Sequence, residues 1–271
     1  MKKAIQSTLY KFGYQITKVK KHTSSKPKRY PSVDIFDLVI NDYLRSSGKD
    51  SSEFNFVQIG AHDGVWCDPI NNYVKKYHWH GLLVEPQLNA FKKLVENYTD
   101  EPQLKFENAL ILNQDKENVS LYTVRHEEGN EALFKLAYMA RLDRDSLVRE
   151  LSNFGLKNAD SLVEAIKVPA LTIPTLLDKH NIRTLDLLVI DTEGYDFEIL
   201  KMFDLSKIRP AIIQLEIVHL SAEDKDACFA YLASHGYRTA TVVFDAIAYL
   251  QSDGMEQNPG LEIKQLVSQL R

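Results

Sequence analysis

The sequence predicts an α/β domain with a seven-stranded, mostly parallel sheet, an antiparallel edge strand and helices on both faces. Short apolar runs alternate with helix-length segments from residue 54 onward. The runs are almost continuously apolar, as in strands that are buried on both faces of a parallel sheet. The last two runs are separated by little more than Asp245, which predicts a hairpin and hence an antiparallel edge. A chain of 271 residues suits one such domain with a small addition.

The elements follow in order along the chain. Residues 34–44 read as a helix. Strands are expected over 54–60, 81–85, 104–111, 185–191, 211–218, 237–244 and 246–250, and the helices between them over 69–77, 87–97, 196–203 and 222–235. An extra strand is expected over 117–124. Residues 125–167 are polar, helical and weakly patterned, so they read as an insertion into the main domain, which spans 34–271.

Residues 1–33 read as an amphipathic helix and a basic linker. Residues 1–32 carry nine Lys or Arg and no Asp or Glu, whereas the remainder has 24 basic and 37 acidic residues. An acidic body argues against a nucleic-acid binder. Apolar residues recur at helical spacing in 1–21, at Ile5, Leu9, Phe12, Ile16 and Val19. This stripe could dock on its own domain, on a second subunit of a homo-oligomer, or on an anionic membrane.

The cysteines and the hydropathy indicate a cytoplasmic protein. Cys67 and Cys228 are the only cysteines and lie far apart in the sequence, so they predict neither a disulfide framework nor a zinc module. No apolar run reaches the length of about 18 residues that a spanning helix needs. The N-terminus lacks the apolar core of a signal peptide. We therefore expect a reducing cytosol, and the membrane alternative for residues 1–21 would place the chain at the inner face of the membrane.

A glycine-punctuated turn, Gly60 to Gly64, follows the first strand. Gly60 permits a sharp turn, and Gly64 would let a ligand approach the backbone. The G-x-x-x-G spacing departs from the G-x-G-x-x-G fingerprint of dinucleotide sites, and the charge of Asp63 suits a cation better than a diphosphate. Glu85 ends the second strand, where an acid can accept hydrogen bonds from ribose hydroxyls, and Asn108 is placed to meet an adenine edge. S-adenosylmethionine fits this set, although a plain α/β turn is the alternative.

Two further groups of polar residues end later strands. Asp191 and Glu193 follow the fourth strand, and Glu216 and His219 end the fifth. Clustered acids cost stability unless they bind something, but Glu193 could instead cap the helix that follows. His219 suits a general base near neutral pH, and a satisfied surface or core histidine is its alternative.

We assign no metal ligand from the sequence. Asp191, Glu216 and His219 could also hold an ion of the Mg²⁺ type. His78, Trp79 and His80 are expected in an exposed turn before the second strand rather than in a metal site.

The sequence resembles the FkbM family of S-adenosylmethionine-dependent methyltransferases. The resemblance rests on segments at 56–64, 81–86, 107–111, 171–200 and 210–218, of which "IDTEG" at 190–194 is the more specific. It implies a Rossmann-like class I methyltransferase fold whose last strand is antiparallel, and methyl transfer to an oxygen.

The resemblance also implies roles for individual residues. The turn residues Gly60, Ala61, His62, Asp63 and Gly64 would surround the methionine part of the cofactor. Glu85, followed by Pro86, would hold the ribose, and Asn108 and Ala109 would flank the adenine. Asp191 and Glu193 would face the methionine end and the acceptor. Many family members carry an acid where this chain has Gln58, and Asp63 could replace its charge.

We therefore expect an O-methyltransferase acting on a sugar hydroxyl of a bacterial surface glycan or its precursor. Asp191, Glu193 and His219 are the candidate catalytic residues, and the variable segment 125–167 would choose the acceptor. Two other classes stay open. One is a nicotinamide-dependent oxidoreductase on a similar fold, against which the missing G-x-G-x-x-G counts. The other is a non-catalytic binding protein that retains the fold, against which the intact acids count.

Overall fold

The structure is a computed structural model that describes residues 35–125, 136, 139–242 and 244–250. The helix and linker expected over residues 1–33 lie outside this range. The described residues divide into two compact units, one formed by residues 122–165 and the other by the residues on either side of it. Among them, no helix is long and apolar enough to cross a membrane.

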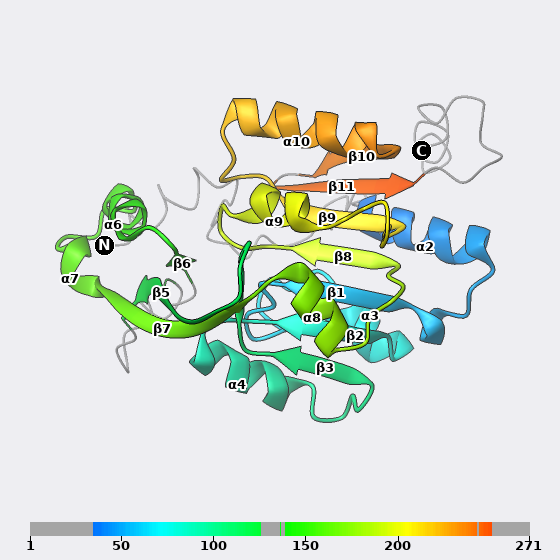
Figure 1. The fold of residues 1–271 in the computed structure, drawn as a ribbon, viewed down its shortest axis with the longest axis horizontal. Helices are drawn as coiled ribbons and strands as arrows, with labels where there is room; N and C mark the ends of the chain where they lie inside the picture. The colour runs from blue at the N-terminus through cyan, green and yellow to red at the C-terminus, as the bar shows by residue number, and fades with distance from the viewer. Residues whose placement is uncertain (1–34, 126–135, 137–138, 243, 251–271) are drawn as a thin grey trace, which may run out of the picture. The chain divides into compact units, whose positions relative to one another are not determined.

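The larger unit is built on a seven-stranded sheet (Figure 1). Its strands, in the order in which they lie across the sheet, are β3 (Leu104–Glu107), β2 (His80–Val84), β1 (Asn55–Ile59), β8 (Leu187–Ile190), β9 (Ile212–Glu216), β11 (Asp245–Leu250) and β10 (Tyr237–Val242). The first five are parallel to one another. The seven predicted strands are all present, and the fold class is confirmed.

The strand of opposite direction is β11, which pairs antiparallel with both β9 and β10. The predicted hairpin between the last two strands is therefore confirmed, and the last strand of the sequence is the antiparallel one. It lies one position in from the edge, however, because β10 forms the edge itself. This insertion brings Asp245 opposite Glu216, at the end of β9 where the site lies.

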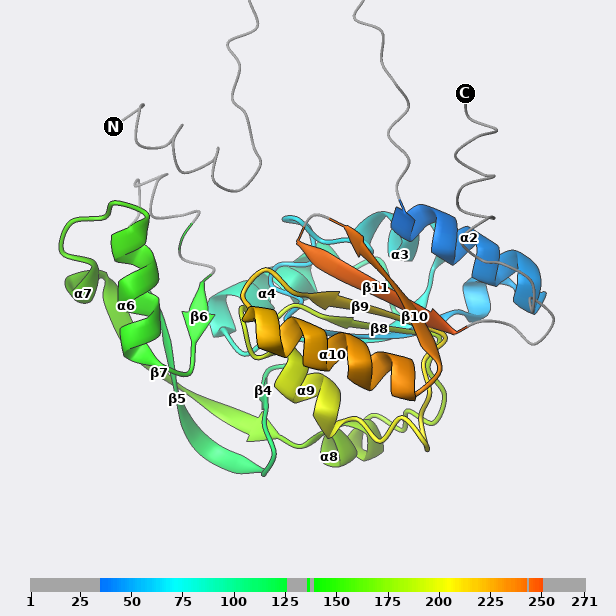
Figure 2. The ribbon, with the colours of Figure 1, turned by 90° about the horizontal axis from the view of Figure 1, so that it is seen from above.

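Helices cover both faces of the sheet, as predicted (Figure 2). One face packs against α8 (Ile173–Lys179), α9 (Asp196–Met202) and α10 (Ala222–Ser234). The other packs against α2 (Ile35–Ser47), α3 (Asn71–Tyr77) and α4 (Leu88–Asn97). Alternation along β1 supplies both cores: Val57 and Ile59 face the first layer of helices, and Phe56 faces the second. A short 3₁₀ turn, η1 (Ser51–Glu53), precedes β1.

The strand predicted over 104–111 is two strands. β3 ends at Glu107, and β4 (Leu110–Ile111) then pairs with the last residues of β7 (Val163–Leu171). The predicted extra strand is β5 (Lys116–Val124). β7 is a strand that we did not predict, because its alternating pattern falls where the sequence reads as a helical insertion.

The smaller unit, residues 122–165, has a hydrophobic core of its own. It contains β6 (Ala140–Arg141), α6 (Arg144–Asn153) and α7 (Ala159–Leu162). Asp143 caps α6 by accepting a hydrogen bond from the Ser146 amide at 2.7 Å. The buried residues of this core are Val124, Met139, Leu147, Leu151, Ala159 and Val163.

Candidate functional site

The predicted site residues follow strands that lie side by side. Ile59 is in register with Val84 on β2 and with Ile190 on β8, and Ile190 is in register with Leu215 on β9. The next residues along each chain segment are Gly60, Glu85, Asp191 and Glu216. They therefore meet at the carboxyl edge of the sheet, where open α/β sheets bind ligands.

Gly60 and Asp191 are in close backbone contact. Gly60 has a φ of +85°, and a Cβ atom placed on it would lie 1.7 Å from the carbonyl oxygen of Asp191. The Asp191 amide donates to the carbonyl of Ile59 at 2.9 Å. No residue with a side chain fits here, so the glycine lets β1 turn directly beside the end of β8.

Gly64 has a different role from the one that we expected. Its φ is +68°, and a Cβ atom there would lie 2.4 Å from the ring of Tyr98 and 2.6 Å from the side chain of Leu94. The glycine therefore lets the turn pack against α4. Access for a ligand to the backbone is not needed to explain it.

The turn between the glycines holds a carboxylate beside an imidazole. Asp63 Oδ1 accepts hydrogen bonds from the amides of Val65 (3.0 Å) and Trp66 (2.8 Å), and His62 Nδ1 lies 3.4 Å from it. Burial alone would raise the pKa of Asp63, but the two amides together with His62 outweigh it and hold the pKa below its usual range. Burial lowers the pKa of His62 despite the nearby Asp63. At neutral pH the turn thus carries one negative charge.

Glu85 is buried, with 4% of its surface exposed, and it is held by backbone amides. Its two oxygens accept from the amides of His62 (2.9 Å) and Gln87 (2.8 Å). Burial raises its pKa to about 7. Each carboxylate oxygen keeps a second lone pair, so this geometry is compatible with the predicted hydrogen bonds to ribose hydroxyls.

Asn108 fixes the path of the chain after β2. Its side-chain nitrogen donates to the carbonyls of Glu85 (2.8 Å) and Pro86 (3.0 Å), while Ala109 beside it is buried. Both hydrogen bonds of the side-chain nitrogen are thereby used within the protein. Any contact of Asn108 with an adenine would use its side-chain oxygen or its backbone.

The loop from Asp191 to Tyr195 is organised by Asp196, which the sequence analysis missed. Asp196 is 1% exposed, and its oxygens accept from the amides of Thr192 (2.8 Å) and Gly194 (2.9 Å). Burial raises its pKa to about 6. The N-cap of α9 is Tyr195, and no side chain makes a cap hydrogen bond there, so the capping alternative for Glu193 is wrong. The available signal was the acid at the first position of the helix.

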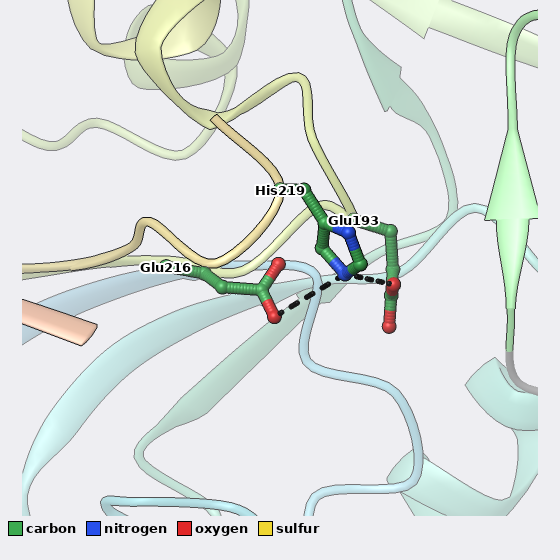
Figure 3. Close-up of side chains that lie close together, drawn as sticks. All are labelled: Glu193, Glu216 and His219. Atoms are coloured by element: carbon green, nitrogen blue, oxygen red, sulfur yellow. Dashed lines mark ion pairs between the residues drawn. The ribbon is translucent and has the colours of Figure 1, made fainter. Parts of the chain in front are cut away.

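Glu193 instead lies beside His219 (Figure 3). Its Oε2 is 3.1 Å from His219 Nε2, and Glu216 Oε1 is 3.8 Å from the same nitrogen. Glu193 has a φ of +59°, a left-handed conformation that is uncommon for a residue with a side chain. His219 therefore lies beside acids from two strand ends, and its catalytic role stays a prediction.

The surrounding carboxylates perturb one another strongly. Burial, followed by the charges of Asp191 and Glu193, raises the pKa of Glu216 to about 11. Asp191 remains accessible to solvent although protein surrounds most of its carboxylate, and desolvation together with Glu193 raises its pKa well above the usual range. Burial raises the pKa of Asp245 to about 6. Such a cluster favours the binding of protons or cations.

Gln58 occupies the position where the resemblance leads one to expect an acid. It is 2% exposed, and its Nε2 donates to Asp68 Oδ2 at 3.1 Å. Asp68 Oδ1 accepts from the amides of Ile70 and Asn71, each at 2.7 Å. Asp68, which we did not predict, thus brings a carboxylate to the end of β1 from the segment that follows the glycine turn.

Two groups of side chains have metal-ligand spacing among the described residues. One is Glu193, Glu216 and His219, and the other is Asp191, Asp196 and Glu216; within each group the ligand atoms lie within 4.8 Å of one another. The trio proposed from the sequence is divided between them. His78 and His80 belong to neither group, and they contact Glu101 (2.9 Å) and the carbonyl of Ser52 (3.0 Å). Both are exposed as expected, but Trp79 between them is fully buried, so the exposed-turn prediction is wrong for Trp79.

Comparisons with known proteins give a family. The model for the methyltransferase FkbM domain matches residues 58–239, well over half of the chain. No curated protein matches significantly. Similar solved structures include the precorrin-6y C5,15-methyltransferase of Geobacter metallireducens GS-15 (13% identity, 84% of this chain and 94% of that one, TM-score 0.41). Another is the N-terminal domain of human METTL16, solved alone and with SAH (each 12% identity, 92% of this chain and 80% or 81% of that one, TM-score 0.40).

Proposed function

The chain belongs to the FkbM methyltransferase family and is an S-adenosylmethionine-dependent methyltransferase, and from this premise we propose that it methylates a hydroxyl oxygen of a sugar. The sugar would belong to a bacterial surface glycan or its precursor. The observation that carries the proposal is the Glu193–His219 pair at 3.1 Å, set among carboxylates at the strand ends. Membership in a methyltransferase family leaves the nicotinamide-dependent alternative without support.

The residues present fit the cofactor. Gln58 Oε1 is buried and has no hydrogen-bond partner within the part of the chain that the structure describes. A buried orphan acceptor is costly, and a cationic ligand or one with N–H donors would satisfy it. The turn 60–64 would hold the methionine part, Glu85 the ribose, and Asn108 with Ala109 the adenine. S-adenosylmethionine supplies an electrophilic methyl group when it is bound.

The acids and His219 supply the proton acceptor that a hydroxyl needs. The raised pKa of Asp191 makes it a stronger base than an ordinary carboxylate. His219 is the other candidate, with Glu193 fixing the orientation of its ring. A positioned general base contributes roughly 10²–10⁴-fold to the rate. Alignment of the acceptor with the methyl group adds to this.

The charge of the site favours a neutral, polyhydroxylated acceptor. Carboxyl groups and an imidazole exchange hydrogen bonds with sugar hydroxyls, and the acids that are ionised repel phosphate-rich chains. This supports a glycan and argues against a nucleic acid. The segment 125–167 would contribute to acceptor choice, and residues 1–21 would bring a cytoplasmic enzyme to the inner face of the membrane.

Transfer of a labelled methyl group tests the acceptor class. The full chain is incubated with labelled S-adenosylmethionine and either lipid-linked glycans, free monosaccharides or an amine panel. We expect label on glycan hydroxyls, in an alkali-stable ether. Label on amines alone would overturn the proposal. Absence of turnover with every acceptor, despite cofactor binding, would favour the non-catalytic alternative.

Vesicle binding tests the membrane contact separately. The full chain is co-sedimented with phosphatidylglycerol vesicles, next to a Leu9→Glu, Phe12→Glu variant that keeps the lysines. Loss of binding in the variant is expected, because acids on the apolar stripe oppose insertion. Equal binding by both proteins would contradict the role of residues 1–21.

A further inference from the structure

We propose that Glu193, Glu216 and His219 bind one first-row divalent metal ion. The site lies where the loops after β8 and β9 meet (Figure 3). Metal binding itself rests on the geometry alone. Its use, which is to hold the acceptor hydroxyl beside Asp191, rests on the function proposed above.

The ligand atoms are already close to metal-binding geometry. Ligands bound at about 2.1 Å, with angles between about 90° and 110°, lie roughly 3.0–3.4 Å from one another. Glu193 Oε2 and His219 Nε2 are 3.1 Å apart, and Glu216 Oε1 is 3.8 Å from the same nitrogen. All three side chains offer one ligand atom within 4.8 Å of the others. Small side-chain rotations would complete the set.

Buried acceptors around the three ligands point to a ligand independently. Glu216 Oε2 has no hydrogen-bond partner in the described part of the chain. Gln214, two residues earlier on β9, is 8% exposed, and its Oε1 is likewise without a partner there. Side chains two residues apart on a strand share a face, and the Gln214 amide hydrogen-bonds to Asp245, which is opposite Glu216. Gln214 therefore points toward Asp245, beside the Glu216 ligand.

Rotation of the amide does not remove the orphan acceptor on Gln214. Its nitrogen is held by the Asp245 carboxylate, so exchanging the nitrogen and oxygen would set two acceptors against each other. A metal ion explains both orphans together. Glu216 Oε2 would take part in coordination, and a water on the metal, which is a hydrogen-bond donor, would reach Gln214 Oε1.

The composition of the set favours one class of metal. Two carboxylates and one imidazole match first-row ions such as Mn²⁺ and Zn²⁺ better than Mg²⁺ or Ca²⁺, which prefer oxygen ligands throughout. A metal with open positions lowers the pKa of a bound hydroxyl.

Metal titration of the full chain tests the site without cofactor or acceptor. The chelator-treated protein is titrated with Mn²⁺, followed by paramagnetic resonance of free Mn²⁺, and with Zn²⁺ by calorimetry. We expect one saturable site, weakened at least tenfold in Glu216→Gln and in His219→Gln. The control Glu198→Gln changes an exposed acid on α9 that pairs with Lys201, and it should bind as the wild type does.

The outcomes separate this proposal from the proposed function. Absence of saturable binding in the wild type, or equal binding in all variants, overturns the metal site while leaving sugar methylation intact. Unfolding would mimic loss of the site, so thermal melting is recorded for each variant. Glu193→Gln, at a more exposed ligand, provides a second test: unchanged affinity in a folded Glu193→Gln overturns the three-ligand assignment.

Discussion

Glu193 Oε2 lies 3.1 Å from His219 Nε2, although the two residues follow different strands and are 26 positions apart. Glu193 follows β8 and His219 follows β9, and these strands are parallel neighbours. The contact connects the acids that follow β8 with Glu216 at the end of β9. It places His219 beside the acids that follow β8, and a catalytic role for His219 is the prediction that follows.

Removing this imidazole should slow methyl transfer without releasing the cofactor. We expect His219→Ala to lower kcat by about 10²–10⁴-fold, because it removes either a base or a ligand of the metal that activates the hydroxyl. The dissociation constant for S-adenosylhomocysteine should change little. Steady-state kinetics and calorimetry measure the two quantities. His80→Ala, at the opposite end of the sheet, is the control; equal kinetics in both variants would remove His219 from catalysis.

The contact between Gly60 and Asp191 predicts a large loss of stability on adding one carbon. Gly60→Ala would place a Cβ atom 1.7 Å from a backbone oxygen and force a residue with a side chain to a φ of +85°. The strained backbone alone costs on the order of 1–3 kcal/mol, and the clash adds to that. Gly48→Ala is a matched control, since its φ is +63° but nothing lies within 4 Å. Urea unfolding should show a clearly larger loss at Gly60; equal losses would contradict the close approach.

Acid pKa values that are raised in the fold predict that stability falls as pH rises. Burial raises the pKa of Glu85 to about 7 and those of Asp196 and Asp245 to about 6. The folded state then binds more protons than the unfolded state between about pH 4 and 7, so the free energy of unfolding decreases through that window. The melting temperature of the protein without ligands should therefore rise as the pH is lowered from 8 to 5.5.

Asp245→Asn isolates one part of this dependence. The variant cannot ionise, so its melting temperature should change less with pH than that of the wild type. The corresponding replacement at an exposed acid, Glu117→Gln, should leave the dependence of the melting temperature on pH unchanged. A slope in Asp245→Asn as steep as in the wild type would show that Asp245 does not titrate as described.

The outer acceptor of the proposed metal site gives a further prediction. Gln214→Leu keeps the three ligands but removes the oxygen that would receive the metal-bound water. Loss of such partners typically costs 10–100-fold in metal affinity, and we expect a loss in that range by Mn²⁺ titration. Gln103→Leu, a partly buried residue at the other end of the sheet, is the control. Unchanged affinity in Gln214→Leu would remove the residue from the site.

Strand ends are the part of the site that the sequence predicts well. An acid follows each of three apolar runs, at Glu85, Asp191 and Glu216. Parallel strands bring these positions together regardless of the loop conformations. The contacts of Asp68 and Asp196 depend instead on how loops fold back on backbone amides. Asp196 could be suspected from its place at the start of a predicted helix, but nothing in the sequence marks Asp68.

The arrangement of β10 and β11 shows a similar limit. The short connection at Asp245 predicts a hairpin, but both orders of its strands across the sheet satisfy that connection. The order depends on packing: β11 carries the buried Ala246, Ile247 and Ala248, whereas β10 is mostly exposed and suits the edge. Likewise, Gly64 is explained by Tyr98 and Leu94, which are 30 or more residues away in the sequence.

The most direct test of the site is calorimetric titration with S-adenosylhomocysteine of the wild type, Glu85→Ala and the control Glu117→Ala. The account predicts micromolar binding by the wild type and the control, and its loss in folded Glu85→Ala, because Glu85 would hold the ribose. Undiminished binding by Glu85→Ala, or none by the wild type with and without Mn²⁺, would contradict it.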